Sequence, residues 1–362
     1  MSEPYVVIMA GGRGERFWPQ SRLSCPKHLL PIVGESPMLA QTVARLEGLV
    51  PPENVFVVTN REQREATLEA CPDLLPEQVV GEPMGRDTAA AVGLAALLVK
   101  RASEDAVFAM LPADHVIDRA TGFREVLRTA FAAAAQDDIF VTIGVRPTEP
   151  ATGYGYVQRG DFRGEVEGRS IYEVKRFVEK PDLDTASGYL ESGDYFWNAG
   201  MFVWRPEVIL NALAVHAPEL REGLLDLENR WNSGENLDVC MEGIYPELPR
   251  ISIDYAVMEK ADNVVVVESD FDWDDVGEWP AVGRHFPTDE AGNVSKGEVV
   301  VLDSSDNLVI SPRGRLTALL GVEDLIVVET DKATLVCHRS KAQEVKQLVQ
   351  EISRREDGES WT

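Results

Sequence analysis

The fold of this chain is decided near its start by one stretch, Val6-Val7-Ile8-Met9-Ala10-Gly11-Gly12-Arg13-Gly14-Glu15-Arg16. A short run of apolar, mostly β-branched residues ends there in three glycines within four positions. This pattern is typical of a buried strand whose backbone turns sharply at its carboxyl end. Glycines at such a turn let successive N–H groups converge on an anion, and the two arginines add positive charge. The stretch alone leaves two interpretations equally open, a polyphosphate-binding loop and an ordinary glycine-rich strand end.

Strand-like and helix-like segments alternate from this stretch to about residue 145. We expect strands at residues 5–10, 54–59, 78–81, 106–111 and 139–145, and helices at residues 37–49, 62–70, 88–102 and 121–136. The alternation predicts an α/β fold with a Rossmann-like, mostly parallel sheet covered by helices on both faces. Ligands of such sheets bind beyond the carboxyl ends of the strands. Residues 11–16, 82–88 and 112–115 all follow strands and are therefore expected at one edge of the sheet.

The segment after the glycines separates this loop from two well-known phosphate-binding loops. In a dinucleotide-binding loop the glycines lead straight into a helix. Here a proline-containing segment of residues 16–31 intervenes, and the next helix is expected only near Pro37. The pattern G-x-x-x-x-G-K-[ST] does not occur either. The sequence thus excludes a P-loop nucleoside triphosphatase and disfavours a nicotinamide-dependent oxidoreductase.

The pattern of strand-like and helix-like segments changes at about residue 150 and again after Pro287. Residues 150–285 mix strand and helix patterns, with helices expected at residues 206–216, 219–231 and 253–261. Five short strands at regular spacing follow Pro287, at residues 297–303, 307–310, 315–320, 325–329 and 333–336. Regularly spaced short strands predict a small all-β domain. Residues 341–354 have apolar side chains at helical spacing and are expected to form an amphipathic helix. We therefore expect a larger domain of residues 1–286 and a small β domain with a C-terminal helix of residues 287–362.

Composition and charge exclude several classes of function. The formal net charge of −26 argues against a nucleic-acid-binding surface, which needs a basic footprint. No run of about 18 apolar residues occurs, and no charged leader precedes an apolar stretch. The four cysteines are widely spaced, without a C-x-x-C pair, and H-E-x-x-H is absent. We expect a cytoplasmic protein with reduced thiols that binds neither nucleic acid nor membrane.

Acidic residues from two distant segments are candidates for a metal site at the expected binding edge. Asp114 lies in Leu111-Pro112-Ala113-Asp114-His115, at the end of a core strand, and Asp274 and Asp275 lie in an acidic loop that ends at Gly277 and offers a second carboxylate. Two carboxylates from distant segments, completed by water and phosphate, suit Mg²⁺. The alternatives are a turn or helix-cap role for Asp114 and a solvated acidic turn for the second loop. Lys27 and Lys180 both lie among prolines, where a lysine either forms a salt bridge or faces an anion.

Six motifs occur together in the order found in sugar-1-phosphate nucleotidyltransferases, which the chain resembles over nearly its whole length. These motifs are Gly11-Gly12-x-Gly14-x-Arg16, Pro26-Lys27, Pro112-Ala113-Asp114-His115, Phe177-Val178-Glu179-Lys180-Pro181, Trp197-Asn198-Ala199-Gly200-Met201-Phe202 and Trp273-Asp274-Asp275-Val276-Gly277. Three further phrases resemble the branch of the family that uses GTP and mannose 1-phosphate: Phe17-Trp18-Pro19-x-Ser21, Glu82-Pro83 with Arg86-Asp87-Thr88-Ala89-Ala90, and Ser252-Ile253-Asp254-Tyr255-Ala256-Val257-Met258-Glu259-Lys260. The small β domain resembles a truncated left-handed β-helix.

The resemblance implies a role for each matching residue on the nucleotide side. Backbone amides of Gly11, Gly12 and Gly14 would hold the β- and γ-phosphates of GTP, with Arg13 and Arg16 as charged partners. Lys27 would neutralise the α-phosphate, and Asp114 and Asp275 would hold Mg²⁺. Asp275 is preferred to Asp274 because the pattern of the family is Asp-x-Gly. Glu82, Arg86, Asp87 and Thr88 are expected at the base or ribose, although Asp87 could instead cap the alanine-rich helix that follows it.

On the sugar side, Lys180 would bind the phosphate of mannose 1-phosphate. Glu179, Asn198, the turn at Gly153 and Asp254 would contact the sugar, although Asp254 could equally cap the helix after it. The implied reaction is a direct in-line displacement at the α-phosphorus of GTP, catalysed by Arg16, Lys27 and Lys180 through positioning and charge neutralisation.

Two alternatives stay open, a relative that uses another base or sugar such as glucose 1-phosphate, and a catalytically silent nucleotide-sugar sensor. The resemblance also allows a homodimer.

Overall fold

The computed structural model describes residues 3–358 and 360–362 with their side chains, and the backbone of residue 359. It divides into two compact units. Unit 1 contains residues 3–11, 43–113 and 117–273, and unit 2 contains residues 12–42, 114–116 and 274–362. Helix α1 (Met38–Ala44) carries the chain from unit 2 into unit 1. The chain thus changes unit within the glycine stretch and again at Asp114.

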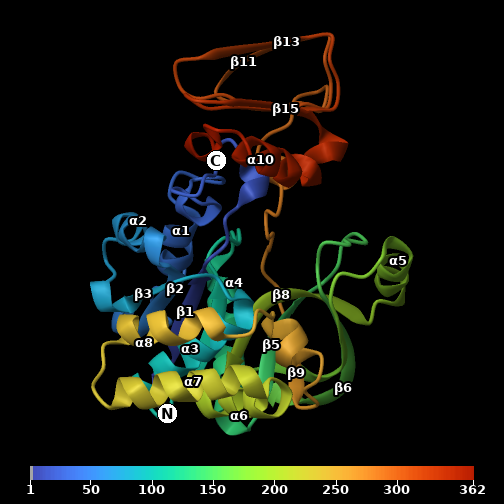
Figure 1. Cartoon of the computed structure of the whole chain (residues 1–362). Helices are drawn as coiled ribbons and strands as arrows, with labels where there is room; N and C mark the ends of the chain where they lie inside the picture. Colours follow the sequence, from blue (N-terminus) through green and yellow to red (C-terminus); the bar gives the residue numbers. More distant parts are fainter. Residues whose placement is uncertain (1–2) are drawn as a thin grey trace. The chain divides into compact units, whose positions relative to one another are not determined.

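Unit 1 is organised around a nine-stranded sheet with the order β3-β2-β1-β4-β8-β5-β9-β7-β6 (Figure 1). β7 and β8 run against the other strands, so the sheet is mostly parallel in direction, as predicted. The strands are β1 (Tyr5–Ala10), β2 (Val55–Asn60), β3 (Val79–Glu82), β4 (Phe108–Pro112), β5 (Phe140–Val145), β6 (Tyr156–Val166), β7 (Arg169–Val178), β8 (Tyr195–Trp204) and β9 (Val264–Glu268).

Helices cover both faces of this sheet (Figure 1). They are α2 (Arg64–Ala70), α3 (Asp87–Ala102), α4 (Ala120–Gln136), α5 (Leu183–Ser192), α6 (Pro206–His216), α7 (Pro218–Asn232) and α8 (Leu237–Ile244). On one face α3 packs against α6 and α7 over a core that includes Val7 and Met110. α4 packs against β5, β8 and β9, and its buried side chains are not part of that core.

The close approach of α3 and α7 follows from small side chains. The first half of α3 is alanine-rich, and its residues from Ala89 to Val99 are buried. A Cβ atom on Gly93 would lie 2.2 Å from Leu224 Cδ1 of α7, which is far inside van der Waals contact. Glycine at this position therefore sets the distance between the two helices.

The structure differs from the sequence-based expectation at several elements of unit 1. α5 and α8 were not expected, although each begins with a side-chain cap, on Asp182 and Asn236 respectively. Residues 253–261 do not form a regular α-helix but contain a short π-helix (Asp254–Met258). β8 lies between β4 and β5 and pairs antiparallel with both, an insertion that strand–helix alternation cannot predict.

Unit 2 combines the C-terminal strands with the segment that follows the glycines. One sheet has the order β10-β12-β14-β15, and the other pairs β11 with β13. The paired strands belong to successive coils of the chain and run parallel, except that β15 runs antiparallel to β14. The elements are β10 (Val294–Lys296), β11 (Glu298–Leu302), β12 (Leu308–Ile310), β13 (Leu316–Leu320), β14 (Leu325–Glu329), β15 (Thr334–His338), α9 (Trp279–Gly283) and α10 (Val345–Ser353). Parallel pairing of coils agrees with the expected β-helix-like domain and its terminal helix.

Phe17, Trp18 and Ile32 share one buried core with residues of the C-terminal strands and of α10. Trp18 Nε1 also donates a hydrogen bond to the carbonyl oxygen of Trp361 at 2.8 Å. Unit 2 therefore takes residues from both sides of residue 286, and the domain boundary expected there stays a prediction.

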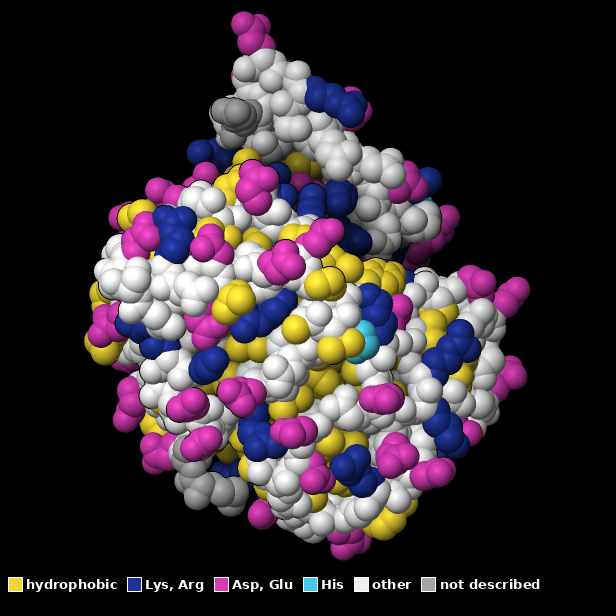
Figure 2. All heavy atoms as spheres, turned by 60° about the horizontal axis from the view of Figure 1, so that its bottom comes forward, with side chains coloured by type: hydrophobic (Ala, Val, Ile, Leu, Met, Phe, Trp, Pro, Cys, Tyr) yellow, Lys and Arg dark blue, Asp and Glu magenta, His cyan; other side chains and the backbone are white. Residues whose placement is uncertain are grey.

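Two further properties concern the surface. Over the described residues no helix is long and apolar enough to span a membrane. On the face drawn in Figure 2, the side chains of Lys and Arg are interspersed with those of Asp and Glu.

Candidate functional site

The glycine turn is held by its last glycine. Gly14 has φ of +63°, in the left-handed region that favours glycine, whereas Gly11 and Gly12 do not have positive φ. A Cβ atom on Gly14 would lie 2.7 Å from Lys27 Cβ and 2.9 Å from Ser21 Oγ. Ser21 Oγ in turn donates to the carbonyl oxygen of Arg13 at 2.9 Å. The turn is thus packed directly against the segment that carries Lys27.

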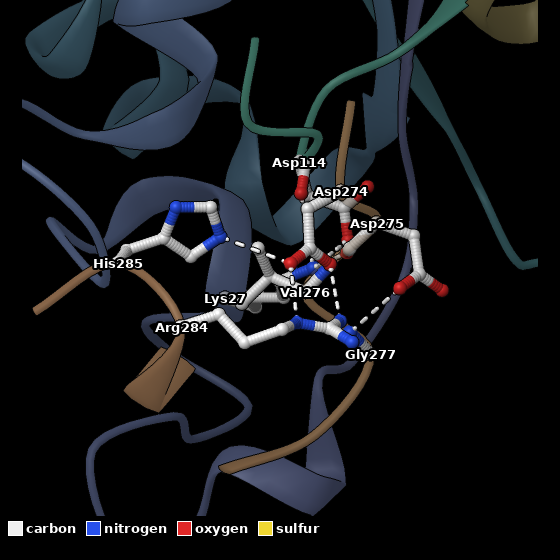
Figure 3. A network of polar contacts seen from close by, with 8 residues as sticks. All are labelled: Lys27, Asp114, Asp274, Asp275, Val276, Gly277, Arg284 and His285. Carbon is white, nitrogen blue, oxygen red and sulfur yellow. Dashed lines mark hydrogen bonds and ion pairs between the residues drawn. The ribbon is translucent and has the colours of Figure 1, made fainter. Parts of the chain in front are cut away.

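Lys27 joins three segments of unit 2 (Figure 3). It begins a short 3₁₀ helix (Lys27–Leu29), and only 5% of its surface is exposed. Its Nζ donates to Asp114 Oδ2 at 2.8 Å, to the carbonyl oxygen of Asp114 at 3.0 Å and to that of Asp275 at 2.8 Å. An ammonium group has three protons, so all three are used. The structure brings together Lys27, Asp114 and Asp275, which the resemblance assigns to one reaction centre.

The charge state of Asp114 follows from this contact. Burial by itself would raise the pKa of Asp114, but the neighbouring Lys27, with smaller effects of His115 and His28, lowers it to about 2. The carboxylate is therefore ionised at neutral pH, and 39% of its side chain is exposed. The salt bridge that the sequence left as an alternative for Lys27 is present.

The loop that carries Asp275 is fixed by its neighbour Asp274 (Figure 3). Asp274 accepts hydrogen bonds from Arg284 Nε and Nη2, both at 2.9 Å, and from Val276 N at 2.8 Å. His285 Nε2 lies 3.0 Å from Asp274 Oδ2. Burial raises the pKa of Asp274, but these contacts outweigh it and lower the pKa below its usual value.

The backbone of Asp274 pairs with that of Val116 in both directions, at 2.9 and 3.1 Å. This pairing holds the loop beside the segment of Asp114. Because the carboxylate of Asp274 is already saturated with donors, it is not a solvated acidic side chain. Asp275 is therefore the better candidate of the two to meet a metal ion, as the sequence analysis preferred.

The carboxylates of Asp114 and Asp275 fit Mg²⁺ by their chemistry. Both are hard oxygen donors, and Lys27 brings their segments together. Among the residues that the structure describes, no group of three or more His, Cys, Asp or Glu side chains could hold a metal ion. Mg²⁺ commonly takes one or two protein carboxylates and completes its octahedron with water and phosphate oxygens, so two carboxylates are a sufficient set of protein ligands.

Glu82 ends β3 in unit 1 and is almost fully buried, with 5% of its surface exposed. Its Oε1 accepts a hydrogen bond from the hydroxyl group of Tyr245 at 2.7 Å. Its Oε2 lies 3.8 Å from the position that a Cβ atom on Gly11 would take. Burial raises the pKa of Glu82 to about 7, against the opposing effect of the Tyr245 hydrogen bond. β1 and β3 run parallel to β2, so Gly11 and Glu82 lie at the same edge of the sheet.

The start of α3 lies near the same tyrosine. Arg86 Nε donates to the carbonyl oxygen of Tyr245 at 3.0 Å. Asp87 is the first residue of α3, has φ of +65°, and its Oδ1 accepts from the N–H of the next residue, Thr88, at 2.8 Å. The N-cap position is taken by Arg86 without a side-chain cap, so the expectation that Asp87 caps α3 is wrong. Thr88 Oγ1 accepts from Ile253 N at 2.8 Å. These contacts order the loop between β3 and α3.

A second group of polar residues in unit 1 contains the expected sugar ligands. Lys180 Nζ lies 2.9 Å from Glu179 Oε1, and Asn198 Nδ2 donates to Asp254 Oδ1 at 3.2 Å. Burial, followed by the nearby charge of Glu179, raises the pKa of Asp254 to about 6. The hydrogen bond to Glu179 raises the pKa of Lys180 despite its partial burial.

Gly155, rather than Gly153, is packed against this group. A Cβ atom on Gly155 would lie 2.4 Å from Glu179 Oε2, whereas one on Gly153 would have no neighbour within 4 Å. The two expected phosphate-binding arginines, Arg13 and Arg16, are both exposed. Burial raises the pKa of Glu278, and the charge of Arg16 opposes this effect without reversing it.

Sequence reasoning missed several residues that position the site. Tyr245, Arg284 and His285 carry no motif of their own that indicates these contacts. Ser21 belongs to one of the quoted phrases, but its hydrogen bond to Arg13 was not expected. Thr142 was also missed, and its Oγ1 donates to Asn198 Oδ1 at 3.3 Å. A buried threonine or tyrosine hydroxyl in an apolar strand or helix was the available signal, because such groups seek a polar partner.

Two protein-family models match most of the chain. A family model described as nucleotidyl transferase matches residues 5–291, and one described as a MannoseP isomerase/GMP-like beta-helix domain matches residues 297–352. The chain belongs to the nucleotidyl transferase family.

Its relatives include curated proteins named mannose-1-phosphate guanylyltransferase. The protein of that name from Klebsiella pneumoniae is 41% identical over 98% of this chain and 74% of its own length. One from Escherichia coli is also 41% identical, over 95% of this chain and 73% of its own length. A crystal structure from Thermus thermophilus, described as a mannose-1-phosphate geranyltransferase, aligns with a TM-score of 0.85 at 38% identity, covering 97% of this chain and 99% of that chain. All three descriptions name mannose 1-phosphate.

Proposed function

We propose that this protein transfers GMP from GTP to mannose 1-phosphate and releases GDP-mannose and pyrophosphate. The observation that carries the proposal is the single ammonium of Lys27, which contacts Asp114 and Asp275 beside the glycine turn at Gly14. The names of the curated relatives support the choice of GTP and mannose 1-phosphate. This is the Mg²⁺-assisted reaction that the sequence resemblance implies.

We assign the phosphates of GTP to the glycine turn and its neighbours. Backbone N–H groups of Gly11, Gly12 and Gly14 bind the β- and γ-phosphates, and the exposed side chains of Arg13 and Arg16 add charge. Lys27 neutralises the α-phosphate during attack. Since all three of its protons have acceptors, Lys27 must exchange one of these acceptors for a phosphate oxygen.

The carboxylates of Asp114 and Asp275 would hold Mg²⁺, which supplies charge neutralisation on the transferred phosphoryl group when bound. Asp274 keeps Asp275 in place through its contacts with Arg284 and Val276. The low pKa of Asp114, caused mainly by Lys27 against the effect of burial, keeps this ligand ionised.

The base and the sugar are assigned to the two polar groups of unit 1. Glu82, Arg86, Asp87 and Thr88 are assigned to the guanosine part. Lys180 binds the phosphate of mannose 1-phosphate, while the side chains of Glu179, Asn198 and Asp254 contact hydroxyl groups of the sugar, with Gly153 and Gly155 at the adjoining turn. A phosphate monoester is already ionised near neutral pH, so the attacking oxygen needs no general base, and catalysis is positioning and charge neutralisation.

Two further proposals concern the cellular compartment and the oligomeric state of the protein. The four cysteines are free thiols, which supports a reducing compartment such as the cytoplasm. A homodimer stays a prediction that sedimentation of the purified protein tests.

A panel of nucleotides and sugar phosphates tests the proposal. Pyrophosphate release is measured with GTP, UTP, dTTP and ATP, each with mannose 1-phosphate or glucose 1-phosphate. GTP with mannose 1-phosphate should give the highest kcat/KM. A tenfold preference for another nucleotide or sugar overturns the assignment, and turnover with none of them supports a silent sensor.

A further inference from the structure

We propose that Tyr245 is a positioning residue for base selection, which acts through Glu82 by fixing the carboxylate so that one oxygen faces the N–H donors of guanine. This inference rests on the proposed use of GTP. It concerns a side chain that lies 163 residues from Glu82 in the chain and belongs to none of the motifs discussed above.

The first argument comes from what surrounds the carboxylate of Glu82. A buried carboxylate normally has a cation or several donors as partners, because burial without them is costly. Among the side chains that the structure describes, only the Tyr245 hydroxyl group donates a hydrogen bond to Glu82, at Oε1. Oε2 lies on the side of Gly11, in the loop that we assign to the nucleotide. The carboxylate is thus half satisfied by side-chain donors, with its second oxygen directed toward the binding edge.

The second argument is that Tyr245 is confined by its surroundings. Its side chain is fully buried within the core beneath α3, α6 and α7. Its backbone is held as well, since Arg86 Nε donates to its carbonyl oxygen at 3.0 Å. A hydroxyl group buried in this way and 2.7 Å from Oε1 favours one rotamer of Glu82 more strongly than a solvated donor would.

The third argument concerns which base such a carboxylate accepts. Guanine presents two adjacent donors, N1–H and the exocyclic 2-amino group, and a fixed carboxylate can accept from both. Uracil and thymine offer a single N–H between two carbonyl groups, whose oxygens a carboxylate repels. Adenine and cytosine offer an amino group beside a ring acceptor. A carboxylate with a fixed orientation therefore selects guanine more strongly than a mobile one.

Tyr245→Phe tests the inference because it keeps the buried ring and removes only the hydroxyl group. Steady-state kinetics are measured with GTP and with ITP, which lacks the 2-amino group, at saturating mannose 1-phosphate and Mg²⁺. We expect the wild-type protein to prefer GTP over ITP at least tenfold in kcat/KM. In the variant this ratio should fall to about threefold or less, through a higher KM for GTP and a kcat within about twofold of wild type.

Tyr156→Phe is the matched control, since Tyr156 is also fully buried and donates to a backbone carbonyl group, that of Ala151, at 2.9 Å. It should leave the GTP to ITP ratio unchanged. Glu82→Gln provides a second, independent test, because it removes the anionic acceptor and should lower the ratio in the same way.

An unchanged ratio in Tyr245→Phe or in Glu82→Gln overturns the inference, as does an equal rise of KM for both nucleotides. A wild-type protein that does not turn over GTP overturns the proposed function instead, so the two failures are distinguishable.

Discussion

Lys27 Nζ lies 2.8 Å from Asp114 Oδ2, although the two residues are 87 positions apart, and the same nitrogen donates to the carbonyl oxygen of Asp275. A buried ammonium in this position does two things. It holds three segments of unit 2 together, and it keeps a positive charge beside the glycine turn. Variants of Lys27 and of its neighbours can separate these two roles.

Replacing Lys27 by alanine should reduce kcat at least a hundredfold, since one lost electrostatic stabiliser of this kind costs about 3 kcal/mol of transition-state stabilisation. The measurement is pyrophosphate release with GTP, mannose 1-phosphate and Mg²⁺. Lys27→Met is the control for packing, because it keeps most of the side-chain volume and should lose activity equally. A turnover within tenfold of wild type in either variant contradicts the catalytic role.

Gly14→Ala should destabilise unit 2 by about 1–3 kcal/mol, because alanine is strained at this positive φ and its Cβ would meet Lys27 and Ser21. Chemical denaturation followed by tryptophan fluorescence measures the change. Gly12→Ala is the matched control, since a Cβ there has no neighbour within 4 Å, and it should alter the free energy of unfolding by about 0.5 kcal/mol or less. Equal stability of the two variants would show that the turn does not need Gly14.

Asp274→Asn should lower the free energy of unfolding by about 2–3 kcal/mol, because the carboxylate loses its charge and its paired contact with Arg284. It should also raise the Mg²⁺ concentration needed for half-maximal activity, since Asp274 holds the loop of Asp275. Arg119, which pairs with Asp272 on the exposed surface, supplies the control variant Arg119→Gln. Arg119→Gln should lower the free energy of unfolding by less than about 0.5 kcal/mol. A similar effect of both substitutions would argue against the positioning role of Asp274.

The strands next to the binding edge could be predicted from the sequence, because strong local patterns and tertiary packing agree there. β1 spans the residues predicted for it, since an apolar β-branched run bounded by glycine has few alternatives. Lys27, Asp114 and Asp275 could be named as a group because the family resemblance links them. Their contact geometry could not, because it depends on packing between segments that are distant in the chain.

Other features depend on contacts that leave no local pattern. The insertion of β8 between β4 and β5 is decided by pairing between distant strands. The hydrogen bond from Tyr245 to Glu82 joins a helical segment to a strand end, and neither local sequence indicates the other. Gly155 replaces Gly153 as the glycine next to Glu179 because Tyr156 of β6 pairs antiparallel with Val178 of β7, which places the preceding Gly155 beside the following Glu179.

Glu82 should make stability depend on pH. Burial raises its pKa to about 7, from an ordinary value of 4.5, so the folded protein keeps this proton over a pH range in which the unfolded chain has lost it. Stability from this group is therefore greatest below about pH 4.5, falls as pH rises to about 7, and is constant above that. The wild-type free energy of unfolding should fall by about 3 kcal/mol relative to that of Glu82→Gln across this range. A difference that does not change with pH would contradict the assigned burial.

The most direct test of the central claim is to identify the products that the purified protein forms from GTP, mannose 1-phosphate and Mg²⁺. Phosphorus NMR of the mixture should show GDP-mannose and pyrophosphate appearing in equal amounts. Chelation of the metal or the substitution Asp114→Asn should stop both. Absence of GDP-mannose, release of inorganic phosphate in place of pyrophosphate, or undiminished turnover in Asp114→Asn would contradict the account.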